Sequence, residues 1–177
     1  MRCCRALNKK NVKFFIRQLT QADELFLWEM LYHAVYVPEG HEPFPREIVA
    51  EPEIARYVLG WGKPNDDGFA AVEEITQQLV GAVWIRLFTR ENRGYGYVRA
   101  DTPELSVAVL PGYRNHGVGT DLLRHMIDEA RKRYSGLSLS VSSQNPARRL
   151  YERLGFEVVA QDGASLTMLK TFEEVGR

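Results

Sequence analysis

The sequence is short of the residues and runs that mark several large protein classes. Its 177 residues include two cysteines, the adjacent Cys3 and Cys4, which cannot form a disulfide framework or, with so few histidines nearby, a metal site. We interpret them as incidental thiols of a tail, with palmitoylation or redox sensing as alternatives. No apolar run approaches the ~18 residues of a membrane helix, and the basic start lacks the apolar core of a signal peptide. The sequence therefore predicts a cytoplasmic protein with no membrane partner.

An excess of charge of either sign is also missing. Lysine plus arginine and aspartate plus glutamate number 23 each, so the formal net charge is zero. This balance gives no electrostatic case for nucleic acid as a main partner, although it allows a local basic patch for a small polyanion. The content of 45% hydrophobic and 26% charged residues is ordinary for a globular chain and excludes wholesale disorder and coiled coil. We expect a flexible tail over residues 1–12 and a single domain over 13–177.

The hydrophobic pattern alternates between the periods of strands and helices. We expect the first helix to follow the N-cap Thr20 and to bury a stripe. The stripe is Leu25, Trp28, Tyr32, Val35 and Tyr36. The predicted strands are 13–19, 68–75, 79–88, 105–110, 137–141, 156–161 and 165–170, and the later helices are 46–59, 118–134 and 145–155. This order predicts an α/β fold in which a mixed, mostly antiparallel central sheet is flanked by helices on both faces.

The most informative segment is the turn between the strand 105–110 and the helix that follows it. It reads PGYRNHGVGT, from Pro111 to Thr120. Two glycines allow the backbone to approach a ligand closely, and the free N–H groups of the next helix point into the same space. Arg114 adds a charge, so the turn predicts a phosphate or pyrophosphate site. It is neither a Walker loop, because Gly-Lys-Ser/Thr is missing, nor a dinucleotide fingerprint.

Two motifs in this half of the chain resemble one known family. Arg114-x-x-Gly117-x-Gly119 is similar to the R/Q-x-x-G-x-G/A signature of the GNAT acetyltransferase superfamily. Downstream, Asn145 precedes a helix that reads A-x-x-L-Y-x-x-x-G-F from Ala147 to Phe156, which also resembles the family. The resemblance implies the GNAT-like acyl-CoA N-acyltransferase fold and the activity of an N-acetyltransferase. The enzyme would move the acetyl group of acetyl-CoA to a primary amine by direct attack in a ternary complex, without a metal.

The resemblance also implies which residues bind acetyl-CoA. The backbone groups of Val107 and Val109 would pair with the pantetheine arm, and the N–H of Val109 would polarise the thioester carbonyl. Asn145 would contact the arm besides capping its helix. The residues implied for the pyrophosphate are Arg114, Asn115, Gly117, Val118, Gly119 and Thr120.

Two residues are implied for catalysis. By resemblance Tyr151 is the general acid that protonates the leaving thiolate, whereas its helical spacing alone places it in an apolar stripe. Glu104, at the start of the central strand, is the candidate base for the amine, with Glu73 and Glu74 as rivals. The alternative is a non-catalytic acyl-CoA-binding or sensing module on the same fold, which would need neither a general acid nor a base.

The resemblance leaves the acceptor open, since the segments expected to form its pocket match no motif. They are rich in aromatic and acidic residues, which suits a small cation. We expect a small-molecule or peptide amine, bound by a monomer or homodimer. The aromatic residues are Trp28, Tyr32, Tyr36, Trp61, Trp84, Tyr95 and Tyr97, and the acidic ones are Glu39, Glu42, Asp66, Asp67 and Asp101.

Overall fold

The computed structural model describes residues 12–172. Of the predicted tail, only residue 12 lies in this range; Cys3 and Cys4 lie outside it. In chain order the elements are β1 (Phe14–Gln18), η1 (Gln21–Asp23), α1 (Glu24–Ala34), η2 (Arg46–Ala50), α2 (Pro52–Ala55), β2 (Asp67–Glu73), β3 (Leu79–Arg86), β4 (Glu104–Val109), η3 (Pro111–Tyr113), α3 (Val118–Ala130), β5 (Gly136–Ser142), α4 (Arg148–Arg153), β6 (Glu157–Asp162) and β7 (Ser165–Thr171).

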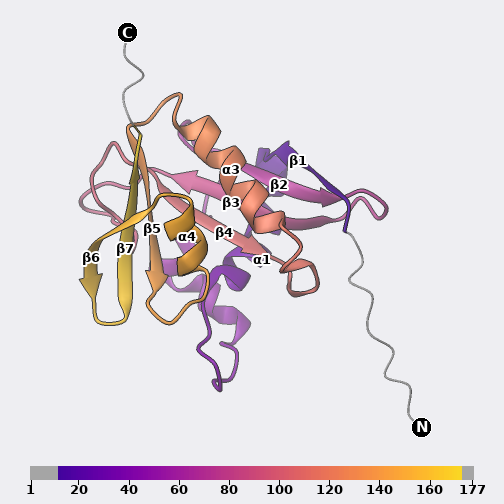
Figure 1. Cartoon of the computed structure of the whole chain (residues 1–177), viewed down its shortest axis with the longest axis horizontal. Coiled ribbons are helices and arrows are strands. Elements are labelled where there is room, and N and C mark those ends of the chain that lie inside the picture. Colours follow the sequence, from indigo (N-terminus) through magenta and orange to yellow (C-terminus); the bar gives the residue numbers. More distant parts are fainter. Residues whose placement is uncertain (1–11, 173–177) are drawn as a thin grey trace.

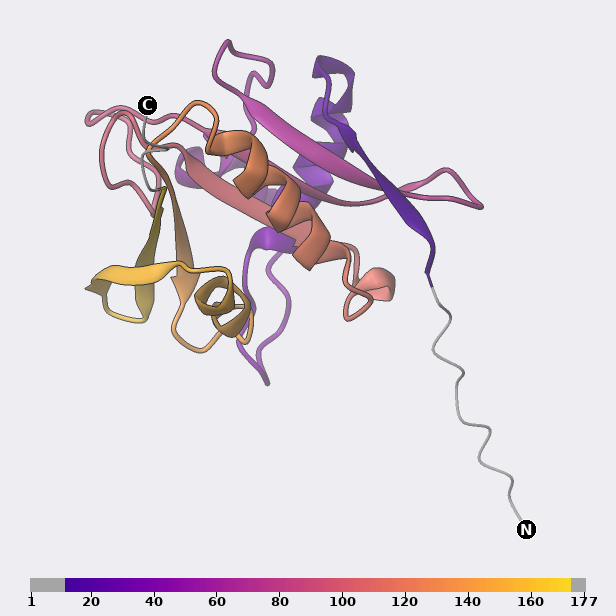
Figure 2. The same ribbon diagram turned by 45° about the horizontal axis from the view of Figure 1, so that its top comes forward.

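All seven strands form one sheet in the order β1-β2-β3-β4-β5-β7-β6. Neighbouring strands run antiparallel except β4 and β5, which are parallel. The sheet is mixed and mostly antiparallel, as predicted. Figure 2 shows the β5–β7 half and the β1–β4 half separating from each other.

Helices cover both faces of the sheet and enclose a separate core on each side. On one face α3, seen crossing the strands in Figure 1, buries the apolar stripe that the sequence predicts, from Val118 through Leu122 and Met126 to Ala130. On the other face α1 packs on β3 and β4, where Leu27, Met30 and Trp84 are fully or almost fully buried. The sheet itself divides between β4 and β5, where its two halves separate and a cleft can open.

The face that α1 buries differs from the prediction. Leu25 is 85% exposed, whereas Leu27, Met30 and Leu31 form the buried side of the helix. The reason is that apolar residues occur almost all round α1, so its hydrophobic period does not define one face. Trp28 and Tyr32 are partly buried at the edge of the stripe that packs. No helix within residues 12–172 is long and apolar enough to cross a membrane.

Candidate active site

A cleft opens where β4 and β5 part. The two strands pair in register only at Glu104 and Ser138, where the N–H of Ser138 donates to the carbonyl of Pro103 at 3.1 Å. Beyond that point residues of both strands line a cleft of about 400 Å³, together with side chains from α1, α2 and α4. This volume lies in the range of small-molecule sites.

The free backbone edge of β4 faces this cleft. Alternate residues of a strand direct their backbone groups to opposite neighbours. The carbonyl of Pro103 points to β5, while the N–H of Leu110 points to β3 and donates to the carbonyl of Val80 at 2.9 Å. By this alternation Val107 and Val109 direct their N–H and carbonyl groups toward the side of β5, where the strands have already parted. The two valines therefore offer an extended ligand a strand-like edge.

The turn at the end of β4 presents a second set of free N–H groups. Asn115 and Gly117 have positive φ angles of 64° and 86°, and α3 follows at once. The first N–H with an acceptor inside this helix is that of Asp121, which donates to the carbonyl of Gly117 at 3.0 Å. The N–H groups of Val118, Gly119 and Thr120 precede it, so they are available to an anion at the positive end of the helix.

The side chains around this turn leave room for a ligand. A Cβ added to Gly117 would meet no atom within 4 Å, and one added to Gly119 would meet only Val109 Cγ2, at 3.6 Å. Arg114 donates from Nε to the carbonyl of Val109 at 3.0 Å while its side chain stays exposed. Val118 contributes only its backbone, because its side chain is buried in the core. The predicted pyrophosphate residues therefore lie together where β4, whose first residues line the cleft, turns into α3.

The helix α4 brings Asn145 and Tyr151 to the cleft wall. Asn145 Oδ1 accepts the N–H of Ala147 at 2.9 Å and so holds the turn before α4, whose N-cap is Ala147 and not the predicted Asn145. Tyr151 packs edge-to-face on Phe156 with ring centroids 6.1 Å apart, and its hydroxyl forms no hydrogen bond within residues 12–172. Burial raises the pKa of Tyr151 to about 12, so at neutral pH this hydroxyl keeps its proton and can act as a donor.

Glu104 lines the same cleft and is buried, with 3% of its surface exposed. Its Oε1 accepts the hydroxyl of Tyr57 at 2.6 Å and the N–H of Gly96 at 2.8 Å. Its Oε2 is buried and has no hydrogen-bond partner in the described chain. Burial raises the pKa of Glu104 to about 7, against the opposing effects of the Tyr57 and Gly96 hydrogen bonds and the charge of Arg56. A carboxyl with this pKa exchanges a proton readily near neutral pH.

The rival bases lie outside this cleft. Glu73 ends β2, where its Oε2 accepts the N–H of Thr76 at 2.6 Å and also bonds the Thr76 hydroxyl, and this holds the hairpin turn. Glu74 is exposed in the same turn. Neither residue lines the cleft.

The expected aromatic and acidic pocket is only partly present. Tyr36 and Tyr95 line the cleft, whereas Trp61 and Trp84 are buried in the second core. The acidic residues of the proposed set are mostly engaged elsewhere: Asp66 pairs with Arg86, Asp67 with Arg133 and Asp101 with Arg99. Asp66 and Asp67 pair with arginines that are distant in sequence, so the sequence could not exclude these two residues from the expected pocket. No cluster of three potential metal ligands occurs within residues 12–172.

Sequence reasoning missed Tyr57, the main partner of Glu104. It is 47 positions away and belongs to the turn after α2, a segment with no motif. One signal was visible, because the loop over residues 89–103 is long for a compact domain and contains Gly94-Tyr95-Gly96-Tyr97. That loop supplies the N–H of Gly96 to Glu104.

Comparison with known proteins identifies the family. Residues 23–156 match the model of the "Acetyltransferase (GNAT) family", which is more than half of the chain. A streptothricin acetyltransferase of Streptomyces lavendulae is 43% identical over 60 residues, which is 33% of this chain and 32% of that protein. The chain thus matches about a third of that relative's length.

Solved structures share the fold over nearly the whole chain. The ribosomal-protein-S18-alanine N-acetyltransferase of Escherichia coli is 22% identical with a TM-score of 0.62, covering 93% of this chain and 97% of that one. The PaiA N-acetyltransferase of Thermoplasma acidophilum, in complex with coenzyme A, is 20% identical with a TM-score of 0.63, covering 90% and 99%. At these identities the likeness concerns the fold.

Proposed function

The chain belongs to the GNAT family of acetyltransferases, and from this premise we propose that it transfers the acetyl group of acetyl-CoA to a primary amine by direct attack in a ternary complex. One observation carries the proposal. The strand β4 joins two features: its first residues line a cleft with a buried carboxyl and a protonated phenol, and the turn at its other end leads into a helix terminus with free N–H groups.

The donor half of the cleft suits acetyl-CoA, which supplies an acetyl group activated as a thioester. The N–H groups of Val118, Gly119 and Thr120, with Arg114 and Asn115 beside them, would hold the pyrophosphate. The edge of Val107 and Val109 would pair with the pantetheine arm, with the N–H of Val109 toward the thioester oxygen, where a donor stabilises developing negative charge. The amide of Asn145 would contact the arm from the opposite wall, while its oxygen holds the turn before α4.

The acceptor half must remove a proton from the amine. An alkyl ammonium has a pKa near ~10.4, so freeing its lone pair at pH 7 costs about 4–5 kcal/mol. Glu104 would accept that proton, directly or through water, since it is the carboxyl that lines the cleft and its pKa lies near 7. Tyr151 would give its hydroxyl proton to the departing CoA thiolate, so that the thiol leaves uncharged.

The acceptor is proposed to be a small-molecule or peptide amine. Tyr36, Tyr57 and Tyr95 line the cleft together with Glu104, and aromatic rings beside a carboxyl favour a cation. The relative named for streptothricin and the solved structure named for an S18 alanine suggest both kinds of acceptor. The panel to be tested therefore contains streptothricin, a polyamine, a free amino acid and a peptide with an N-terminal alanine.

Calorimetry tests the donor site without knowledge of the acceptor. Gly119→Val places a branched side chain at the helix terminus, where the protein itself offers only the 3.6 Å contact to Val109, so the fold should persist. We expect CoA affinity to fall at least about tenfold, or roughly 1.4 kcal/mol. Gly112→Val, at a glycine whose added Cβ would meet no atom within 4 Å, is the matched control and should retain affinity. Unchanged CoA affinity in a folded Gly119→Val protein contradicts the donor site.

Release of the CoA thiol in the presence of the amine panel tests the reaction. The proposal predicts release that needs both acetyl-CoA and one of the amines. Tight CoA binding without release on any amine would instead support the acyl-CoA-binding or sensing module.

A further inference from the structure

The side chain that binds Glu104 is Tyr57, and neighbouring rings and hydrogen bonds fix Tyr57 in place. The ring of Tyr57 lies edge-to-face on Phe88, with centroids 5.1 Å apart, and stacks on Tyr95 at 6.5 Å and 8°. Its hydroxyl accepts the N–H of Tyr95 at 2.6 Å and donates to Glu104 Oε1 at the same distance. The phenol is therefore a fixed link between the loop and the carboxyl.

The loop approaches so closely that only glycine fits at two positions. A Cβ on Gly94 would collide with Glu104 Oε2, and it would lie 2.7 Å from the Tyr57 hydroxyl oxygen. A Cβ on Gly96 would lie 2.5 Å from the carbonyl carbon of Leu139 on β5. The absence of side chains at these positions lets the backbone of the loop close over Glu104 and Tyr57.

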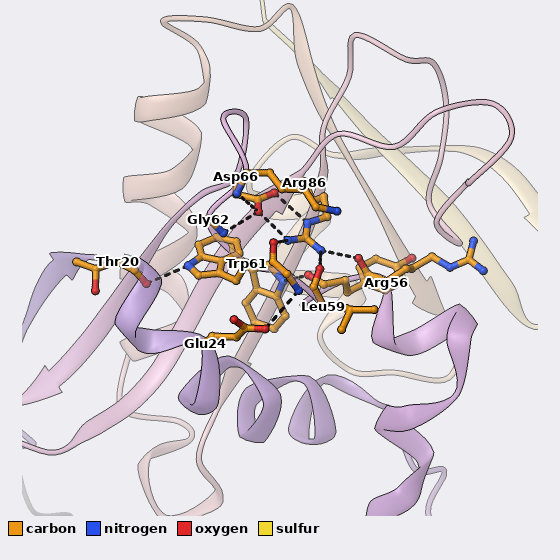
Figure 3. Close-up of polar contacts among 12 residues, drawn as sticks. Thr20, Glu24, Arg56, Leu59, Trp61, Gly62, Asp66 and Arg86 are labelled. Carbon is orange, nitrogen blue, oxygen red and sulfur yellow. Dashed lines mark hydrogen bonds and ion pairs between the residues drawn. The ribbon is translucent and has the colours of Figure 1, made fainter.

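The main chain around Tyr57 is fixed from β3. Trp84 Nε1 donates to the carbonyl of Tyr57 at 3.1 Å, and Arg86 Nη1 donates to the carbonyls of Arg56 and Leu59 at 2.8 and 2.9 Å. Figure 3 shows Arg86 reaching these carbonyls and Asp66 together. These bonds fix the main chain on both sides of Tyr57, and the phenol itself is held by its hydrogen bonds to Glu104 and Tyr95.

No charged side chain among the described residues forms a hydrogen bond with Glu104, so Tyr57 is its principal side-chain contact. Arg86 is the register partner of Glu104 across β3 and β4, but its guanidinium is committed to Asp66 at 2.9 and 2.6 Å. From α2 and its turn the carboxyl faces Tyr57 and the charge of Arg56, from the loop the backbone N–H of Gly96, and from β5 the uncharged Ser138.

We propose that Tyr57 is a positioning residue for Glu104: its phenol fixes Oε1 and stabilises the ionised carboxylate that accepts the proton of the acceptor ammonium. This inference rests on the proposed function of Glu104 as the base. In the step itself an N–H bond of the ammonium breaks, its electron pair stays on nitrogen for the attack, and the proton binds the carboxylate. Tyr57 keeps its own proton, since burial and then the neighbouring charge of Glu104 raise the pKa of its phenol.

The direction of the effect follows from the two opposing influences on Glu104. Burial raises its pKa and the Tyr57 hydrogen bond lowers it. Removing that bond in Tyr57→Phe leaves burial less opposed, so the pKa of Glu104 should rise further. The acid limb of the pH profile of kcat/KM should then move up by about one to two pH units, the size expected for a hydrogen bond to a charged group.

The kinetic experiment compares wild type, Tyr57→Phe and Tyr97→Phe from pH 5.5 to 9.5. Tyr97 belongs to the same loop but lies under Arg93, outside the cleft lining, so Tyr97→Phe should keep the wild-type profile. An unshifted limb in a folded Tyr57→Phe protein, with Glu104→Gln impaired, overturns the positioning role alone. An unimpaired Glu104→Gln protein overturns the base itself.

A measurement on the wild-type protein needs no variant of Tyr57 to fold. Carbon-13 NMR follows the carboxyl resonance of Glu104, assigned by its loss in Glu104→Gln, and the Cζ resonance of Tyr57, without any substrate. The proposal predicts that both resonances move with one common midpoint near pH 7. A Tyr57 resonance that stays constant while Glu104 titrates overturns it.

Discussion

Two buried carboxylates lie near each other in this protein and have opposite surroundings. Asp66 accepts two bonds from Arg86 and the N–H groups of Gly62 and Lys63, at 2.6–3.0 Å. Glu104 accepts bonds only at Oε1, from an uncharged phenol and an amide, while Oε2 has no partner among the described residues. Arg86 and Glu104 are paired across β3 and β4, yet the guanidinium turns to Asp66.

This difference separates a carboxylate that holds the fold from one that has no cation in contact. A buried anion that contacts a cation and a full set of hydrogen-bond donors is held rigidly in place. A buried carboxyl without a contacting cation keeps its proton to higher pH, because burial disfavours the charge. Asp66 also keeps a cation away from Glu104, since it binds Arg86, the buried arginine that is paired with Glu104 across β3 and β4.

The largest effect should come from breaking the Asp66 side of the comparison. Asp66→Asn leaves Arg86 buried, with 4% of its side chain exposed, and without an anion. We expect the free energy of unfolding to fall by about 3–5 kcal/mol, measured by urea denaturation. Asp101→Asn breaks an exposed pair with Arg99 and should cost less than about 1 kcal/mol. Equal costs for the two variants would contradict the structural role of Asp66.

The comparison extends to the two phenols of the cleft. The hydroxyl of Tyr57 is bound to Glu104, whereas that of Tyr151 forms no hydrogen bond to any part of the chain that the structure describes. Tyr151→Phe keeps the ring on Phe156, so the fold and CoA affinity should persist. If Tyr151 is the acid, kcat should fall about 100-fold, or roughly 3 kcal/mol. Steady-state rates within about threefold of wild type would return Tyr151 to a purely packing role.

The free energy of unfolding should depend on pH through the ionisation of Glu104. Its pKa is raised from 4.5 to about 7 in the folded protein, so the folded state holds a proton that the unfolded state releases. The stability from this preference is complete below pH 4.5 and is lost as pH rises through 7. Between pH 5 and pH 8 wild type should lose about 2–3 kcal/mol relative to Glu104→Gln. Urea denaturation curves at both pH values that keep a constant difference would exclude the raised pKa.

The parts that the sequence could predict are those built from neighbouring residues. The turn from Arg114 to Thr120 and the helix of Tyr151 are local, so their spacing alone placed them on the correct elements. The site of Glu104 is assembled from segments 47 and 8 positions away, at Tyr57 and Gly96, and no local pattern links them. The buried face of α1 was predicted wrongly for a related reason. Apolar residues occur almost all round this helix, so its packing on the sheet, and not its own sequence pattern, determines which face is buried.

The central claim is that Glu104 takes the proton of the amine, and the pH dependence of a Glu104→Gln defect tests it most directly. Gln keeps the shape and the acceptor oxygen for Tyr57 but has no basic site. With saturating acetyl-CoA and a primary amine, the rate relative to wild type should be about 100-fold low near pH 7. It should recover to within a few-fold near pH ~10, where the amine frees itself. A defect of the same size at every pH, or none at any pH, would contradict the account.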